Sequence, residues 1–181
     1  MTKKIDWTQN RKFYGWTFME NARMYDALEK YGYKMHSLGI FSFEVFSDGT
    51  IEETGTDISK LMPYKEKWPH INWYLTIMNH GVDSRFTAIR ENINGAQDVF
   101  ISEIHRILDK YPWAVGVDID LERGGEIENK AKANALFKRI YNEVEGRGDG
   151  KLVHADLPAM TGPNQSVGGI VTGKQIGRAH V

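Results

Sequence analysis

The sequence predicts an α/β fold, a truncated (β/α)8 TIM barrel that comprises about its first five strands. Apolar, strand-like segments alternate with helical ones along the chain, which favours a parallel sheet covered by helices. The chain has 181 residues, whereas a complete barrel needs about 250, so three strands and their helices are expected to be missing. The predicted strands lie near residues 13, 36, 71, 114 and 151.

The first half of the chain contains three predicted strands and two predicted helices. The strands are the aromatic or apolar runs 13–18, 36–46 and 71–78, and the helices are 21–30 and 58–67. Ala22, Tyr25 and Leu28 recur at helical spacing in the first helix. Asp57 or Ser59 is expected to cap the second helix at its start.

The second half continues the same alternation. Residues 97–110 predict an amphipathic helix, because their apolar residues fall on one stripe. A strand follows at residues 115–122, and then a glycine-containing loop leads to a helix at residues 129–145. The last predicted strand is residues 151–160. In this order the strand at residues 115–122 is the fourth.

That fourth strand carries three acids on one face. Its apolar and polar residues alternate without a break, and side chains two positions apart on a strand point the same way, about 6.6 Å from each other. The repulsion among Asp118, Asp120 and Glu122 predicts that at least one of them keeps its proton to high pH. A protonated carboxylic acid beside an ionised one suits glycoside hydrolysis. A solvated sheet edge or a calcium site is the alternative explanation of the same acids.

Residues 116–122 resemble the signature of family 18 glycoside hydrolases, the group of chitinases and endo-N-acetylglucosaminidases. The family pattern is Asp-Gly-x-Asp-x-Asp-x-Glu, and seven of its eight positions fit. The exception is Val115, which stands where the family has its first Asp. The resemblance extends over about residues 13–169. In this family the signature also ends the fourth strand of an eight-stranded barrel, and active sites of such barrels lie at the carboxyl ends of the strands.

The resemblance implies a role for each acid. Glu122 would be the general acid that protonates the glycosidic oxygen, with its pKa raised by burial and by its acidic neighbours. Asp120 would accept a hydrogen bond from the substrate's acetamido N–H and turn the acetamido oxygen onto the anomeric carbon, so the substrate itself supplies the nucleophile. Asp118 would share a proton with Asp120 and release it as charge develops at the intermediate.

Five further residues are predicted to bind substrate. Thr76 approximates the start of the Ser-x-Gly-Gly turn that the family has after its third strand, and Asn79 lies at the carboxyl end of that strand. Trp16 could stack on a sugar ring, although a place in the core explains it equally well. Phe43, on the second strand, and Met160, at the end of the fifth, complete the set.

The composition argues against several partners. The 23 basic and 24 acidic residues are scattered among one another, which argues against a nucleic-acid partner. No run approaches the length of a membrane span, so no membrane partner is expected. The absence of Cys and the six scattered His give no metal-ligand spacing, so neither a cofactor nor a metal is expected. The expected partner is a polysaccharide that contains N-acetylglucosamine, and the oligomeric state is not predicted.

The two ends of the chain set the expected domain limits. Residues 1–169 are expected to form a partial catalytic barrel and residues 170–181 a non-native tail, because residues 175–181 read like a translated sequencing adapter. The start lacks a secretory signal, so we expect a bacterial or phage protein in the cytoplasm, on a virion or released by lysis. The leading hypothesis is a retaining hydrolase of chitin-like chains or peptidoglycan that is inactive as this fragment. The alternative is a non-catalytic glycan-binding or phage tail structural protein.

Overall fold

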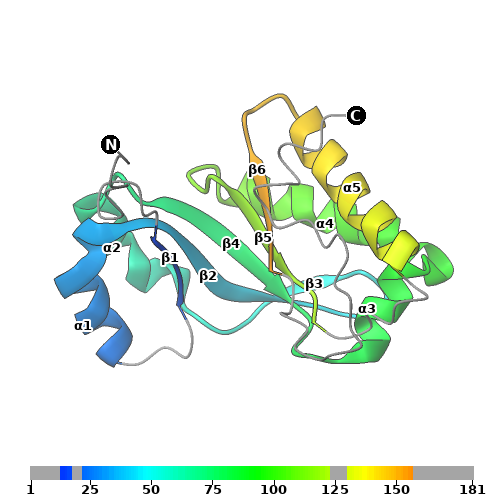
Figure 1. Cartoon of the computed structure of the whole chain (residues 1–181), viewed down its shortest axis with the longest axis horizontal. Helices are drawn as coiled ribbons and strands as arrows, with labels where there is room; N and C mark the ends of the chain where they lie inside the picture. The colour runs from blue at the N-terminus through cyan, green and yellow to red at the C-terminus, as the bar shows by residue number, and fades with distance from the viewer. Residues whose placement is uncertain (1–12, 18–21, 123–129, 157–181) are drawn as a thin grey trace, which may run out of the picture.

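The computed structural model describes residues 13–17, 22–122 and 130–156, which form one sheet with helices packed against it (Figure 1). Five strands are parallel and lie in the order β1-β2-β4-β5-β6, which confirms the predicted half of a barrel. The short β3 pairs antiparallel with the end of β2. The strand bounds are β1 Phe13–Thr17, β2 Met35–Val45, β3 Ile51–Glu53, β4 Asn72–Met78, β5 Gly116–Asp120 and β6 Leu152–Asp156.

Helices connect the parallel strands. Figure 1 shows α1 and α2 near one end of the sheet and α3, α4 and α5 beside the other end. Asp57 caps the turn before α2, because its side chain accepts a hydrogen bond from the Ser59 N–H at 2.9 Å. The helix bounds are α1 Ala22–Tyr31, α2 Met62–Lys67, α3 Asp83–Arg90, α4 Ala96–Lys110 and α5 Lys130–Gly146, with single 3-10 turns at Gly32–Lys34, Ile58–Leu61 and Ile93–Gly95.

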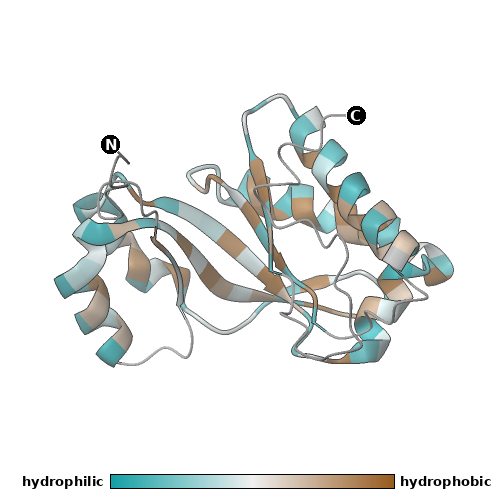
Figure 2. Cartoon of the chain, in the orientation of Figure 1, coloured by the Kyte–Doolittle hydropathy of each residue, from teal (hydrophilic) through white to brown (hydrophobic). Residues whose placement is uncertain are grey.

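The helix-facing side of the sheet forms the apolar core. Leu75, Ile77, Val117 and Ile119 of β4 and β5 are fully buried, in one cluster with the apolar stripe of α4. Figure 2 shows the corresponding brown segments along the strands and helices. Burial of a side chain of this size stabilises the fold by about 1.5–3 kcal/mol. The alternation on β5 therefore fixes which of its faces meets the helices, and the acids lie on the opposite face.

Two elements were not predicted from the sequence. The turn at residues 47–49 sends the chain back as β3, a strand of only three residues that is too short to give a clear alternation. α3 begins with polar residues, although Phe86, Ala88 and Ile89 in its second half are buried. Both elements follow strands that were predicted correctly, so they do not change the order of the sheet.

β1 and β6 are the edge strands of the sheet in the described part of the chain. Each of them pairs with a single neighbouring strand there. Large apolar side chains on these strands are unusually exposed, at 55% for Phe13, 42% for Trp16 and 45% for Leu152. Among the described helices, none combines the length and the apolar character that crossing a membrane requires.

Candidate active site

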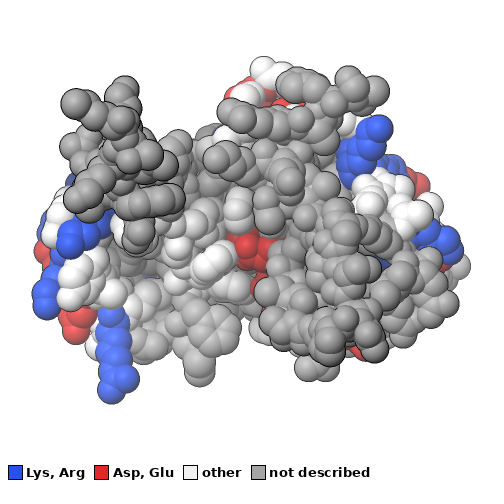
Figure 3. Space-filling view, in the orientation of Figure 1, with Lys and Arg blue, Asp and Glu red and all other residues white. Residues whose placement is uncertain are grey.

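The acids of β5 form a gradient of burial along one face of the sheet. Asp118 is fully buried, Asp120 is half-buried, and Glu122, just beyond the strand, is exposed. Figure 3 shows acidic atoms near the centre of one face of the molecule, with uncharged residues on one side of them. The gradient runs from the interior of the sheet to its carboxyl edge, where the active sites of barrels of this kind lie.

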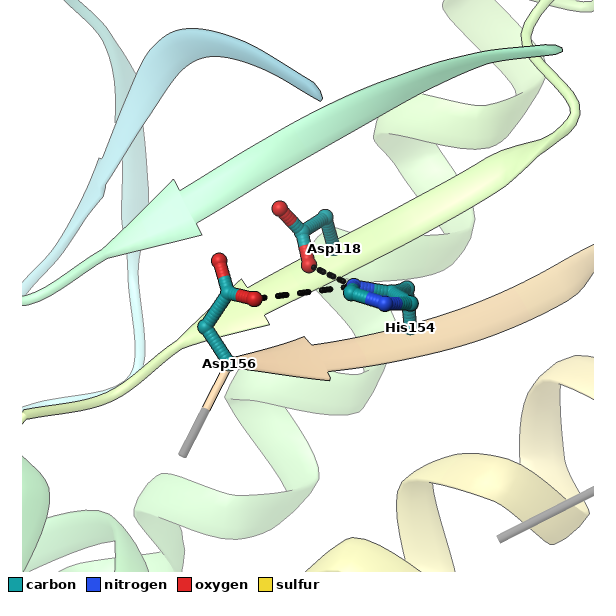
Figure 4. A group of neighbouring side chains, drawn as sticks. All are labelled: Asp118, His154 and Asp156. Atoms are coloured by element: carbon teal, nitrogen blue, oxygen red, sulfur yellow. Dashed lines mark hydrogen bonds and ion pairs between the residues drawn. The ribbon is translucent and has the colours of Figure 1, made fainter. Parts of the chain in front are cut away.

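Asp118 is held by donors from three other strands. Its Oδ2 accepts hydrogen bonds from Trp16 Nε1 on β1 and from Thr76 Oγ1 on β4, both at 3.0 Å. Its Oδ1 lies 2.7 Å from His154 Nδ1 on β6 (Figure 4). A buried carboxylate with this many partners is fixed in place, because rotation would break several hydrogen bonds at once.

The carboxylate of Asp118 also needs the glycine that faces it from β2. A Cβ atom on Gly39 would lie 2.7 Å from Thr76 Oγ1, 2.7 Å from Trp16 Cδ1 and 3.0 Å from Asp118 Oδ2. Non-bonded heavy atoms prefer about 3.5–4.0 Å. Gly39 therefore leaves the space in which Trp16, Thr76 and Asp118 meet, and an isolated glycine within a strand is the sequence signal for such a close approach.

Asp120 is the acid of β5 whose pKa is raised. Burial raises the pKa of Asp120 to about 6, and the negative charges of Glu122 and Asp118 add to the effect. The direction of this shift agrees with the repulsion expected among the acids, but a pKa of about 6 does not keep the proton on Asp120 to high pH. Near neutral pH both forms of Asp120 are populated, as a group that gains and loses a proton during a reaction requires.

The backbone of Glu122 is held by hydrogen bonds, whereas its side chain is exposed. Asn79 at the end of β4 accepts a hydrogen bond from Glu122 N at 3.0 Å, and its Nδ2 donates to Glu122 O at 2.8 Å. The side chain of Glu122 is exposed, so the expectation that this acid is buried is wrong for the described part of the chain. Burial falls on its neighbour Asp120 instead.

Two residues predicted to bind substrate hold the acids instead. Thr76 and Asn79 are fully buried, so neither is placed to touch a sugar. Thr76 donates to Asp118, and Asn79 clamps the backbone of Glu122. Their position at the carboxyl end of β4 was predicted correctly, but their role is to orient the residues on β5.

The prediction that Phe43 contacts substrate is wrong. Phe43 is 1% exposed and packs edge-on against Tyr111, with ring centroids 5.9 Å apart, in the core beneath the helices. The pairing of β2 with β4 shifts between Phe41 and Phe43. Because of this bulge, Phe41 lies opposite Thr76 on the acid-bearing face, while Phe43 lies opposite Ile77 on the helix-facing side.

The remaining two substrate-binding candidates stay predictions. Trp16 uses its ring N–H to hold Asp118, but its side chain is 42% exposed and a ring face could still meet a sugar. Met160 lies outside the described residues. Residues 170–181, expected to be a non-native tail, also lie outside them.

The sequence reasoning missed a polar pair on β6 and an aromatic group beside it. In the register of the sheet His154 lies opposite Asp118 and Asp156 opposite Asp120. The ring of His154 stacks on Tyr14 of β1, with centroids 4.4 Å apart and planes at 14°. The signal for His154 and Asp156 was their alternation with apolar residues on the strand next to the acids.

Asp118, His154 and Asp156 also form a group that could in principle hold a metal ion. One ligand atom from each lies within 4.8 Å of the others. The 2.7 Å between Asp118 Oδ1 and His154 Nδ1 is a hydrogen-bond distance. Two ligands about 2.1 Å from one metal at tetrahedral or octahedral angles lie about 3 Å or more apart. The Asp118–His154 contact is therefore shorter than the separation of two ligands of one metal ion.

The chain resembles known proteins in its fold but not in its sequence. No family model matches the sequence, and no curated protein matches it. Solved structures of barrel hydrolases do match the fold, although every reported identity is below 20%. At such identities the likeness establishes the fold alone.

Three of these structures illustrate the match. A chitinase from Chromobacterium violaceum has a TM-score of 0.68 at 13% identity, over 87% of this chain and 49% of that one. The Bacillus cereus spore cortex-lytic enzyme SleL has a TM-score of 0.69 at 19% identity, over 85% and 36%. A class V chitinase from Nicotiana tobaccum has a TM-score of 0.60 at 14% identity, over 80% and 43%. The chain spans half or less of the length of these neighbours.

Proposed function

We propose that this chain forms the acid-bearing half of a retaining glycoside hydrolase that cleaves polymers containing β-linked N-acetylglucosamine. The observation that carries the proposal is the gradient along β5, with a fixed Asp118 inside, a half-buried Asp120 with a raised pKa, and an exposed Glu122 at the edge. Support also comes from the neighbours, which include chitinases, a spore cortex-lytic enzyme and a class V chitinase in complex with NAG4.

The gradient suits a reaction in which the substrate provides its own nucleophile. The acetamido oxygen of the sugar attacks the anomeric carbon while Glu122 gives its proton to the departing glycosidic oxygen. Ionised Asp120 accepts the hydrogen bond of the acetamido N–H and stabilises the positive charge that develops on the ring intermediate. Water then opens this intermediate as Glu122 takes back a proton, so the anomeric configuration is retained. Asp118 remains a fixed negative charge beneath Asp120.

The roles of the acids are tested in a protein that carries this segment within a complete barrel. Chitooligosaccharides and purified peptidoglycan serve as the two substrate classes. Glu122→Gln is expected to lower kcat by at least about 100-fold, as loss of a general acid does. Glu66→Gln, on the exposed surface of α2, is the matched control and is expected to leave kcat unchanged. Equal turnover by Glu122→Gln and its parent would remove Glu122 from the mechanism.

The participation of the substrate is tested separately from the acid. Fully deacetylated oligosaccharides of the same length lack the attacking oxygen and are expected not to be cleaved, although Glu122 is intact. Proton NMR of freshly formed product is expected to show the β-anomer first. Initial appearance of the α-anomer would replace the proposed reaction by an inverting one.

A non-catalytic glycan-binding or phage tail structural protein is the second candidate. Val115 favours it, since an apolar residue stands where the resembling family has an acid. Its backbone N–H donates to Trp73 O, and its C=O accepts a hydrogen bond from Leu152 N–H. Glycan binding without hydrolysis by the complete barrel would support this candidate. The 181-residue chain alone is expected to show no hydrolysis under either proposal, because the described part of the chain has an unpaired edge at both β1 and β6.

A further inference from the structure

β6 gives each acid within β5 a titratable partner on the neighbouring strand. His154 lies opposite Asp118, and Asp156 lies opposite Asp120. His154 Nδ1 is 2.7 Å from Asp118 Oδ1 and 3.7 Å from Asp156 Oδ1 (Figure 4). The imidazole therefore lies between two carboxylates, one of them fully buried.

The partners of Asp118 show where a proton can reside. Oδ2 faces Trp16 Nε1, which can only donate, and the Thr76 hydroxyl, which donates to the same atom. A proton on Oδ2 would point toward two groups that already donate to this atom, so it would have no acceptor. The one site for a proton on this carboxyl group is thus the contact between Oδ1 and His154 Nδ1, and the nearby Asp156 favours the form in which the imidazole carries it.

The groups that face His154, from its own strand and from the other strands, are carboxylates and phenols. They are Asp118 on β5, Asp156 on β6, Tyr14 on β1 and Tyr74 on β4. The Tyr14 hydroxyl is buried. Burial and the charges of Asp118 and Asp156 raise the pKa of Tyr14, so its hydroxyl stays protonated and neutral. The charges around the imidazole are therefore negative, and they stabilise an imidazolium.

We propose that His154 is a positioning residue that carries the buried proton of this site, so that Asp118 remains a carboxylate and does not exchange a proton with Asp120. The proposal rests on the proposed hydrolase function and deepens it. It differs from the role that the family resemblance implies for Asp118, which is to share a proton with Asp120. In this chain the carboxyl group of Asp120 therefore acts next to a fixed ion pair between Asp118 and His154.

The ion pair has a defined pH range. Burial opposes the charged imidazole, but the hydrogen bond and the charge of Asp118, together with the charge of Asp156, outweigh it and raise the pKa of His154 above 6.5. Burial and the charge of Asp118 raise the pKa of Asp156 to about 7. His154 and Asp156 interact and titrate together, so the proton on His154 is lost at a higher pH than from an ordinary imidazole.

The proton can be located directly in the 181-residue chain by NMR of the histidine side chains. The six histidines are followed between pH 5 and pH 9, and the His154 signal is assigned with His154→Gln. His154 is expected to titrate above 6.5. Asp118→Asn and, separately, Asp156→Asn are expected to lower its midpoint, by about one pH unit or more for Asp118→Asn. Asp156→Asn is included because Asp156 is only half-buried, so this variant folds even where Asp118→Asn does not.

Two results would overturn the proposal. A His154 midpoint at or below 6.5 in the parent chain would show that the imidazole is neutral. Micromolar ZnCl2 that shifts the His154 and Asp156 signals would show that the group binds a metal ion rather than a proton. Neither result depends on hydrolysis, so failure of this proposal is distinguishable from failure of the proposed function.

A second readout uses the complete barrel. His154→Gln keeps a neutral donor and His154→Ala removes it, so kcat is expected to fall about tenfold in the first and further in the second, with KM little changed. The pH–rate profile of His154→Gln is expected to lose the limb at which His154 gives up its proton. His105→Gln, on α4, is the matched control with an unchanged profile. Identical pH–rate profiles of His154→Gln and the parent would contradict the proposal.

Discussion

Asn79 holds Glu122 by both of its backbone polar groups. The Asn79 side chain accepts a hydrogen bond from Glu122 N at 3.0 Å and donates one to Glu122 O at 2.8 Å. The same side chain donates to Val82 O at 3.2 Å and accepts from Gly81 N at 3.3 Å. One buried amide thereby fixes the end of β5 to the loop after β4, while the carboxyl group of Glu122 is left free to move.

Replacement of Asn79 is expected to affect both stability and turnover. Asn79→Ala leaves two backbone groups of Glu122 without partners, which costs about 2–4 kcal/mol. In a complete barrel, kcat is expected to fall roughly 100-fold although Glu122 is present, because misplacement of a catalytic group by about 1 Å costs that much. Urea unfolding and steady-state kinetics measure the two effects. Asn142→Ala, at an exposed position of α5, is the control, and equal loss in both variants would contradict a specific role for Asn79.

Gly39→Ala is expected to disturb the group around Asp118. The added methyl would lie against Trp16, Thr76 and Asp118, so we expect a loss of about 1–3 kcal/mol and a changed fluorescence of Trp16. Thermal unfolding and tryptophan emission measure this. At Gly146 a Cβ would have no neighbouring atom within 4 Å, so Gly146→Ala is expected to be neutral or stabilising. A Gly39→Ala variant as stable as Gly146→Ala would show that the packing around Asp118 is loose.

Asp120→Asn is expected to make the protein more stable at neutral pH and not at acidic pH. The pKa of Asp120 in the folded state is about 6, above the ordinary value of about 3.9, so the folded state binds this proton more tightly than the unfolded state. The resulting stabilisation is complete below about pH 4 and is lost as the pH rises through 6. Because Asp120 is partly exposed, we expect a gain of roughly 1–2 kcal/mol for Asp120→Asn above pH 7.

The measurement is urea unfolding at pH 4 and at pH 7.5. Asp26→Asn, on the exposed surface of α1, serves as the control. A constant difference between Asp120→Asn and the parent at both pH values would show that the carboxyl group of Asp120 does not titrate differently in the folded state.

The two donors to Asp118 Oδ2 are expected to act together. Trp16→Phe removes the ring N–H and keeps an aromatic ring, and Thr76→Val removes the hydroxyl at nearly constant volume. Each change is expected to cost about 1.5–3 kcal/mol, as loss of a hydrogen bond to a charged group does. The double variant leaves Oδ2 without a donor, so its cost is expected to exceed the sum by about 1 kcal/mol. Strict additivity in a double-mutant cycle would contradict a shared acceptor.

The fold and the acids could be predicted because both depend on local patterns. Strands buried on the helix side are apolar runs, and helices between them have a period of 3.6 residues. The alternation around Asp118 placed the three acids on one face without further information. The predicted strands correspond to β1, β2, β4, β5 and β6 of the structure.

The errors come from features that no local pattern records. Strict alternation puts Phe43 on the same face as Gly39, but a bulge after Phe41 turns it to the helices. Asn79 was expected at the sugar because it ends a strand, yet its direction is set by pairing with a residue 43 positions away. The role of His154 follows only from its position opposite Asp118 in the sheet. Each case depends on tertiary pairing.

Tyr14 and His154 bring the two edge strands of the described sheet into direct contact. β1 and β6 are the first and last strands of the five, yet these two rings lie face to face across the inside of the arc. Strand pairing alone leaves β1 and β6 separated by β2, β4 and β5. The ring contact therefore links two strands that share no backbone hydrogen bonds, so a change at either ring would be felt at both edges of the described sheet.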